Sequence, residues 1–162
     1  MTVGPVPKWS VRWTSPKAVG RAQRHTLDHA YLSKLTTAQI EAELIAQAEL
    51  VEASVGGGYR PRFMRPPAGD GIFNFDPRLP EVATRLGLKI AMWNSDSNGW
   101  RVYPRTDQAA IDYVLSNVFA NFSPGTIVIQ HALPVDTLAL PVIVAEANRR
   151  GYVCLTIREG IA

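Results

Sequence analysis

Two histidines four residues apart are the first residues of this sequence that could do chemistry. They stand in the stretch Arg24-His25-Thr26-Leu27-Asp28-His29. Residues four positions apart share one face of a helical turn, so His25 and His29 could bind one metal ion together. Imidazole suits zinc, but a zinc site needs at least a third protein ligand, and a catalytic one also keeps a position for water. Taken alone, the pair equally fits an exposed helix start.

Three later stretches follow the histidine pair along the chain. They are Arg65-Pro66-Pro67-Ala68-Gly69, Trp93-Asn94-Ser95-Asp96-Ser97-Asn98-Gly99-Trp100 and Ile127-Val128-Ile129-Gln130-His131. Together with His25-Thr26-x-x-His29, they resemble the second to fifth signature motifs of the polysaccharide deacetylase domain (NodB-homology, carbohydrate esterase family 4). The resemblance runs from about Arg24 to the C-terminus. The family's first motif, an Asp-Asp pair after the first strand, has no counterpart before His25.

The helices and strands that position these residues are predicted from hydrophobic periodicity and from turn residues. Helices are expected from the capping box Thr36/Gln39 to about residue 55, over 76–86, over 106–118 with Thr106 as cap, and over 138–150. Gly87 and Gly151 are expected to close the second and fourth of these helices. Short strands are expected near residues 11–14 and over 59–64, 88–93, 126–130 and 152–157.

This alternation predicts an α/β fold with a parallel sheet covered by helices. The resemblance implies a partial, distorted and incomplete β/α barrel of the NodB type, with its N-terminal strand and helix missing. We therefore expect an irregular segment over residues 1–23 and a deacetylase-like domain over residues 24–162. In either architecture the polar stretches follow strands or short connections, which predicts that they converge on one rim.

Deacetylation needs an activated water, stabilisation of an oxyanion and an acid for the leaving group. The resemblance implies that His25 and His29 bind a divalent metal, most plausibly zinc. It implies that His131 is the general acid and that Asp96 holds the other nitrogen of that imidazole. Arg65 would orient the catalytic carboxylate.

The resemblance also implies a substrate-binding set. The backbone N–H of Ala68 would contribute to the oxyanion hole, and Pro67 would belong to the same turn. Trp100 and Ile129 would line the pocket for the acetyl methyl group. Three residues depart from the family pattern: Ala68 stands for a tyrosine, Gly99 for a second aspartate, and Ala132 for an aspartate.

The implied function is a metal-dependent hydrolase that removes acetyl groups from a carbohydrate. Its substrate would be a polymer of N-acetylglucosamine, such as chitin or peptidoglycan, or an O-acetylated polysaccharide such as xylan. The alternative is a non-catalytic carbohydrate-binding pseudoenzyme or a fragment of a longer deacetylase, because the Asp-Asp pair supplies the family's general base. Asp28 and Asp70 are the only nearby substitutes, and Asp70 is the better placed.

Composition limits the remaining function classes. The 162 residues carry a net charge of +3, but their Lys and Arg are scattered, so a nucleic-acid partner is not expected. No apolar run is long enough to span a membrane, and no signal peptide is recognisable. The family resemblance suggests a secreted or cell-surface protein if a signal exists upstream. The single cysteine, Cys154, lies in an apolar run and is expected to be buried and inert.

Overall fold

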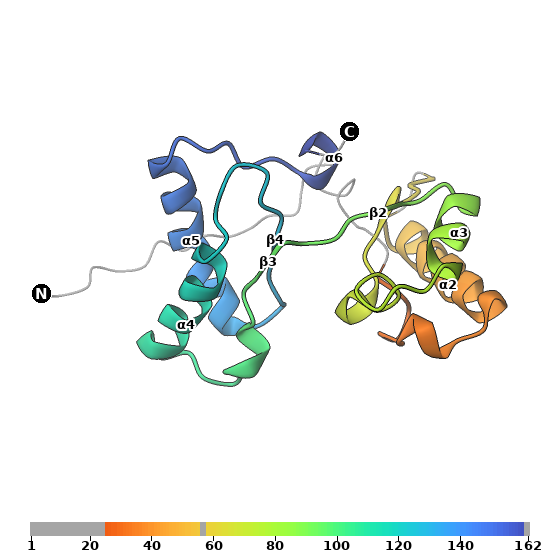
Figure 1. Cartoon of the computed structure of the whole chain (residues 1–162), viewed down its shortest axis with the longest axis horizontal. Helices are drawn as coiled ribbons and strands as arrows, with labels where there is room; N and C mark the ends of the chain where they lie inside the picture. The colour runs from red at the N-terminus through yellow and green to blue at the C-terminus, as the bar shows by residue number, and fades with distance from the viewer. Residues whose placement is uncertain (1–24, 56–57, 161–162) are drawn as a thin grey trace, which may run out of the picture. The chain divides into compact units, whose positions relative to one another are not determined.

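The structure, a computed structural model, describes residues 25–55 and 58–160 (Figure 1). The irregular segment expected over residues 1–23, with its strand near residues 11–14, lies outside the described residues. The chain folds as two compact units, Met1–Ile90 and Ala91–Ala162.

The long helix α2 (Thr37–Val55) supplies much of the core of the first unit. As expected, Thr36 and Gln39 form a capping box, in which Thr36 N–H donates to Gln39 Oε1 (2.8 Å) and Gln39 N–H donates to Thr36 Oγ1 (3.3 Å). Ile40, Leu44 and Ala48 recur at four-residue steps and are buried. They belong to a core that also contains Leu32, Met64, Leu79, Val82, Ala83 and Leu88.

The first unit also contains a β-α-β motif. Strands β1 (Phe63–Met64) and β2 (Lys89–Ile90) pair in parallel, with Met64 opposite Ile90, and helix α3 (Arg78–Arg85) connects them. Gly87, at φ 66°, ends α3 as predicted: its N–H donates to Thr84 O (3.0 Å) and Leu88 N–H donates to Ala83 O (2.8 Å). The strands are shorter than the sequence predicted.

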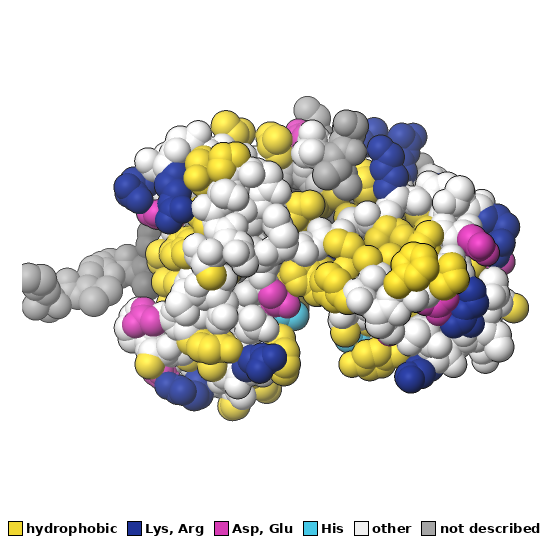
Figure 2. All heavy atoms as spheres, in the orientation of Figure 1, with side chains coloured by type: hydrophobic (Ala, Val, Ile, Leu, Met, Phe, Trp, Pro, Cys, Tyr) yellow, Lys and Arg dark blue, Asp and Glu magenta, His cyan; other side chains and the backbone are white. Residues whose placement is uncertain are grey.

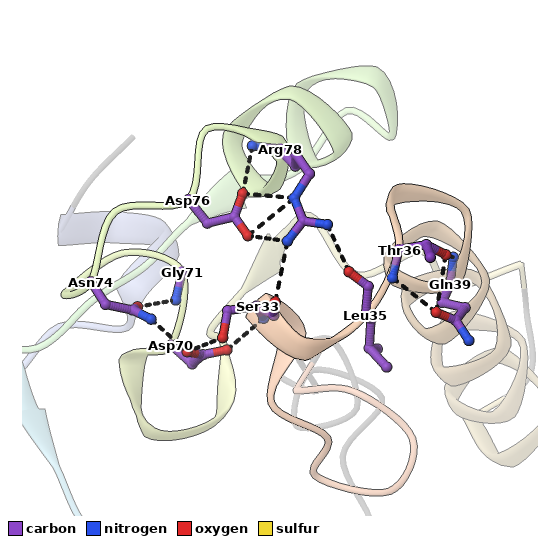
Figure 3. Close-up of polar contacts among 9 residues, drawn as sticks. All are labelled: Ser33, Leu35, Thr36, Gln39, Asp70, Gly71, Asn74, Asp76 and Arg78. Carbon is purple, nitrogen blue, oxygen red and sulfur yellow. Dashed lines mark hydrogen bonds and ion pairs between the residues drawn. The ribbon is translucent and has the colours of Figure 1, made fainter.

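A polar network holds the loop between β1 and α3 (Figure 3). The Arg78 guanidinium pairs with Asp76 (Nε to Oδ1, 2.9 Å) and donates to the carbonyl oxygens of Leu35 (2.7 Å) and Ser33 (3.3 Å). These bonds tie the start of α3 to the segment between η1 (Leu32–Lys34) and α2. The loop that follows the Arg-Pro-Pro-Ala turn is therefore fixed against the rest of its unit.

The second unit repeats this plan. Strands β3 (Ser95–Asp96) and β4 (Val128–Ile129) pair in parallel, with Asp96 opposite Ile129, and helix α4 (Gln108–Phe119) connects them. Helix α5 (Pro134–Arg149) packs on α4. The core contains Ala110, Val114, Val118, Val135, Ala139 and Ile143. Gly151, at φ 73°, ends α5 as predicted, with Tyr152 N–H donating to Ala147 O (2.9 Å).

Several sequence predictions about the second unit are wrong in detail. Helix α5 begins at Pro134, because proline suits the first position of a helix, and not at residue 138. Asp107, and not Thr106, caps α4 by accepting from Ala110 N–H (3.1 Å). Residues 152–156 form no strand, and the chain ends its described part in the short helix α6 (Ile157–Gly160). Cys154 is exposed rather than buried.

Charged side chains of both signs are interspersed on the face drawn in Figure 2. Several form ion pairs, such as Arg85 with Glu41 (2.9 Å) and Arg149 with Glu146 (2.7 Å). No helix of the described residues combines the length and hydrophobicity that crossing a bilayer requires.

Candidate active site

The histidine pair of the first unit comes together without a helix. The two ring centroids lie 5.1 Å apart in an edge-to-face arrangement. Thr26 and His29 have φ values of 64° and 66°, which a right-handed helix does not contain, so the predicted helical turn is wrong. His29 is exposed and His25 half-buried. The side chains therefore meet through a strained loop, not through helical spacing.

His25 is fixed by the backbone of the third motif. Its Nδ1 lies 2.7 Å from the carbonyl oxygen of Arg65. Because a carbonyl oxygen only accepts, Nδ1 carries the hydrogen, and Nε2 of the neutral ring keeps its lone pair. A backbone carbonyl on one ring nitrogen is the usual way in which a metal-binding histidine is oriented.

The Arg-Pro-Pro-Ala stretch forms the short helix η2 (Pro67–Gly69). Pro66 and Pro67 are buried, whereas Ala68 is exposed and has a φ of 54°. Arg65 is half-buried. Two consecutive buried prolines just after β1 fix the path of the backbone, so that Ala68 is presented to solvent in one conformation.

Asp70, one of the two substitutes considered for the general base, is occupied by structural bonds (Figure 3). Its Oδ2 accepts from Ser33 N–H (2.7 Å), and its Oδ1 accepts from Ser33 Oγ (2.9 Å) and Asn74 Nδ2 (3.0 Å). Burial alone would raise the pKa of this carboxyl, but the bonds from Ser33 and Asn74 outweigh it and the pKa lies below its ordinary value. A carboxylate held in this way is a weak base.

Asp28, the other substitute, is exposed. Its Oδ1 accepts from Ala30 N–H (3.0 Å), as an aspartate in a local turn does.

In the second unit, His131 and Asp96 meet side chain to side chain. His131 Nε2 lies 3.2 Å from Asp96 Oδ1, and the two side chains are 31% and 25% exposed. Asp96 sits in β3, and His131 directly follows the neighbouring strand β4. Asp96 Oδ1 also accepts from Asn98 N–H (2.8 Å), which fixes the carboxylate. With Nε2 donating to the ionised carboxylate, Nδ1 is the nitrogen left for proton transfer.

Trp100 and Ile129 flank this pair in sequence but differ in exposure. Trp100 lies in η3 (Gly99–Arg101), is 52% exposed, and carries the Arg101 guanidinium 4.6 Å from its ring centroid. Ile129 is buried in β4. An exposed indole can contact a ligand directly, whereas the Ile129 side chain is buried.

Backbone conformation singles out the same stretches. Four non-glycine residues of the described chain have positive φ, namely Thr26, His29, Ala68 and Asn98. A side chain makes this left-handed conformation unfavourable by about 1–3 kcal/mol, and such residues cluster at active sites, where the surrounding structure enforces them. All four belong to motifs that the sequence analysis selected for their chemistry.

Residues 20–91 match the family model described as polysaccharide deacetylase. This segment belongs to the polysaccharide deacetylase family. The chain also resembles chitin deacetylase 3 of Cryptococcus neoformans, with 31% identity over 137 residues, 77% of this chain and 32% of the relative. It is 27% identical to a peptidoglycan-N-acetylglucosamine deacetylase of Bacillus cereus over 82% of this chain and 46% of the relative. The chain thus spans about a third to a half of the length of these curated relatives.

Solved structures give the same fold. A carbohydrate esterase family 4 pseudoenzyme from Bacillus anthracis superposes with a TM-score of 0.74 at 24% identity, over 86% of this chain and 46% of that chain. A family 4 carbohydrate esterase from Streptomyces lividans in complex with acetate has a TM-score of 0.67 at 24% identity, over 85% of this chain and 69% of that chain. The expected α/β fold of the NodB type is confirmed.

The candidate residues fall into two groups, one in each unit. His25, His29, Arg65, Pro67 and Ala68 lie in the first unit, and Asp96, Trp100, Ile129 and His131 lie in the second. Within each unit the structure brings together the pair that the sequence predicted to act together. The roles of these residues, and their convergence on one rim, stay predictions.

The residues present fit a divalent metal in part. His25 and His29 bring two imidazoles together, and the neighbouring Thr26 is buried with an Oγ1 that has no hydrogen-bond partner within the described residues. Among those residues, no group of three or more His, Cys, Asp or Glu side chains could hold a metal ion. Two imidazoles supply half of a tetrahedral zinc site.

Sequence reasoning missed Asp136, which is buried beside Gly99 at the start of α5. The signal was present, because an aspartate two residues after a proline suits the first turn of a helix. Because the helix was predicted to begin at residue 138, Asp136 was assigned to the loop before it and not to its first turn.

Proposed function

We propose that this protein is a metal-dependent carbohydrate deacetylase acting on N-acetylglucosamine residues of chitin-like or peptidoglycan polymers. One observation carries the proposal: the four left-handed non-glycine residues all lie in the stretches that resemble the deacetylase motifs. Family membership supports the reaction class. The relatives named as chitin and peptidoglycan-N-acetylglucosamine deacetylases favour an N-acetyl substrate over an O-acetylated one.

His131 serves as the general acid in this proposal. Its Nδ1 delivers a proton to the leaving nitrogen, while Asp96 accepts the hydrogen bond from Nε2 and stabilises the charged imidazolium. The contact from Asn98 N–H keeps the carboxylate from rotating away from the ring. Trp100 contacts the sugar, and Ile129 borders the acetyl methyl group.

His25 and His29 are the proposed metal ligands, with zinc the most plausible ion. When bound, such an ion would polarise the acetyl carbonyl and lower the pKa of a bound water. The Arg65 carbonyl orients His25 for this role, and the Arg65 guanidinium would orient the catalytic carboxylate. Ala68 offers its backbone N–H to the oxyanion from an exposed, fixed turn.

A second candidate is a carbohydrate-binding protein without catalysis. It is favoured by Asp70, whose oxygens are occupied by Ser33 and Asn74 and whose lowered pKa makes it a weak base. Under this alternative the motifs hold the sugar, and the acetyl group stays in place.

Acetate release from N-acetylated chito-oligosaccharides in the presence of zinc tests the proposal. We expect His131→Ala to lower kcat by about 10²- to 10⁴-fold, the usual contribution of a general acid, with unchanged metal content. Gln108→Ala, an exposed change on α4, serves as the control and should leave kcat unchanged. Oligosaccharide binding without acetate release would establish the non-catalytic alternative. A protein that neither binds the oligosaccharides nor releases acetate from them would refute both candidates.

A further inference from the structure

A buried carboxylate lies at the start of helix α5. Asp136 is in the first turn of α5 and is only 2% exposed. Neither of its carboxylate oxygens has a hydrogen-bond partner within the described residues. Burying a polar group without such a partner is unfavourable, so the Asp136 carboxylate does not stabilise the fold through hydrogen bonds to the described residues.

The Asp136 carboxylate rests against Gly99. A Cβ atom added to Gly99 would lie 2.2 Å from Asp136 Oδ2 and 2.9 Å from its Cγ, far inside van der Waals contact. The carboxylate therefore fills the volume that a side chain at position 99 would need. Glycine is required here by space, since Gly99 is not among the glycines with positive φ.

The backbone of Asp136 contacts a second segment. Its carbonyl oxygen accepts from Gln130 Nε2 (3.2 Å), and Gln130 directly precedes His131. Gly99, on the other side, belongs to the turn after Asp96, in which Gly99 N–H donates to Ser97 Oγ (3.4 Å) and Ser97 N–H donates to Ile129 O (3.1 Å). One residue of α5 thus contacts both segments that carry the Asp96–His131 pair.

We propose that Asp136 is a positioning residue of the Asp96–His131 pair, because it holds the turn after Asp96 and the strand end before His131 in fixed register. The inference rests on the proposed function, in which this pair delivers the proton. Asp136 acts through Gly99 and Gln130 and touches neither substrate nor the reacting atoms. A general acid must be held to within a fraction of an ångström, which a rigid helix start achieves better than a loop does.

A thermal double-mutant cycle tests the contact with Gly99. Gly99→Ala should lower Tm by about 3–10 °C, because overpacking of this kind is unfavourable by about 1–3 kcal/mol. In the Asp136→Ala background the new methyl group has room, so the same change should shift Tm by less than about 2 °C. Equal shifts in the two backgrounds would show that the contact does not exist and would overturn the proposal.

A spectroscopic signature tests positioning itself. The His131 Nε2 proton exchanges slowly with water only while Asp96 accepts it, so nitrogen-15 NMR should detect it in the wild type and not in Asp96→Ala. We expect Asp136→Ala to lose this signal and the isosteric Asp136→Asn to keep it. Val114→Ala, which truncates a fully buried side chain of the same unit, should lower Tm and keep the signal.

A retained signal in Asp136→Ala would refute the positioning role, whatever happens to stability. If Asp136→Ala does not fold, Gly99→Ala displaces the carboxylate without removing it and should weaken the signal in the same way. Neither measurement needs turnover. The positioning role can therefore fail while His131→Ala still lowers kcat. It can also hold while His131→Ala leaves kcat unchanged, so the two proposals are tested separately.

Discussion

The bond from His25 Nδ1 to the Arg65 carbonyl fixes the orientation of the His25 ring. We expect the protein to retain a divalent transition metal after dialysis, and to do so more weakly than a site with three protein ligands. The double variant His25→Ala, His29→Ala should lose that metal, as measured by elemental analysis. His131→Ala, which removes an imidazole from the other unit, is the matched control and should keep it. Equal metal content in all three proteins would exclude the site.

The Asp70 carboxylate links pH to stability at the residue scale. Its folded-state pKa is below the ordinary 3.8, so its contribution is complete above that value and is lost as the pH falls through the folded-state pKa. We expect Asp70→Asn to lower the free energy of unfolding by about 1–3 kcal/mol at pH 7, because bonds to a charged acceptor are lost.

Urea denaturation at pH 7 and near pH 2 measures this difference, which should shrink at the lower pH, because protonation of the carboxyl below its ordinary pKa removes part of this contribution. Glu49→Gln, an exposed carboxylate on α2, is the control and should show little effect at either pH. A difference for Asp70→Asn that is equal at both values would mean that shape, and not charge, matters at Asp70.

The start of α2 shows how one element depends on two side chains. Thr36→Ala removes the Oγ1 that accepts from Gln39 N–H, and should lower the free energy of unfolding by about 0.5–2 kcal/mol in urea denaturation. Thr36→Ser keeps the hydroxyl and should stay close to the wild type. If serine and alanine behave alike, the capping box contributes nothing measurable.

Local rules predicted the elements that local chemistry determines. The capping box of Thr36 and the glycines at 87 and 151 act through bonds to residues within five positions, so the sequence displays them directly. The strand expected over residues 152–157 failed because an apolar run becomes a strand only when another strand offers it an edge. The wrong expectation that Cys154 is buried has the same cause, because it assumed that this apolar run packs in the core.

The candidate site was predicted by residue type and not by geometry. The spacing of His25 and His29 predicts a helical turn, but Thr26 and His29 have positive φ values. Such values are rare for residues other than glycine, and no sequence pattern predicts them here. The Asp96–His131 contact was anticipated from the family resemblance. The occupation of Asp70 by Ser33, 37 residues away, and the packing of Asp136 on Gly99 depend on tertiary contacts that no local pattern encodes.

At the scale of the whole molecule, each unit has a core built from its own residues. Leu44 is fully buried in the first core, and Leu44→Ala should destabilise by about 2–5 kcal/mol. We expect the resulting loss of amide hydrogen-exchange protection to fall on the first unit, with the amides of α4 and α5 little changed. Leu50→Ala, the same change at an exposed position of the same helix, should leave protection intact. Uniform loss along the chain would indicate that the two units unfold as one.

The exposure of Cys154 has a practical consequence. The chain contains one cysteine, and that thiol faces solvent, so a maleimide dye or a nitroxide will attach at a single place without mutagenesis. The label would sit after α5, in the unit that carries Asp96 and His131. The same thiol allows two molecules to join by air oxidation, so a reducing agent belongs in every storage buffer.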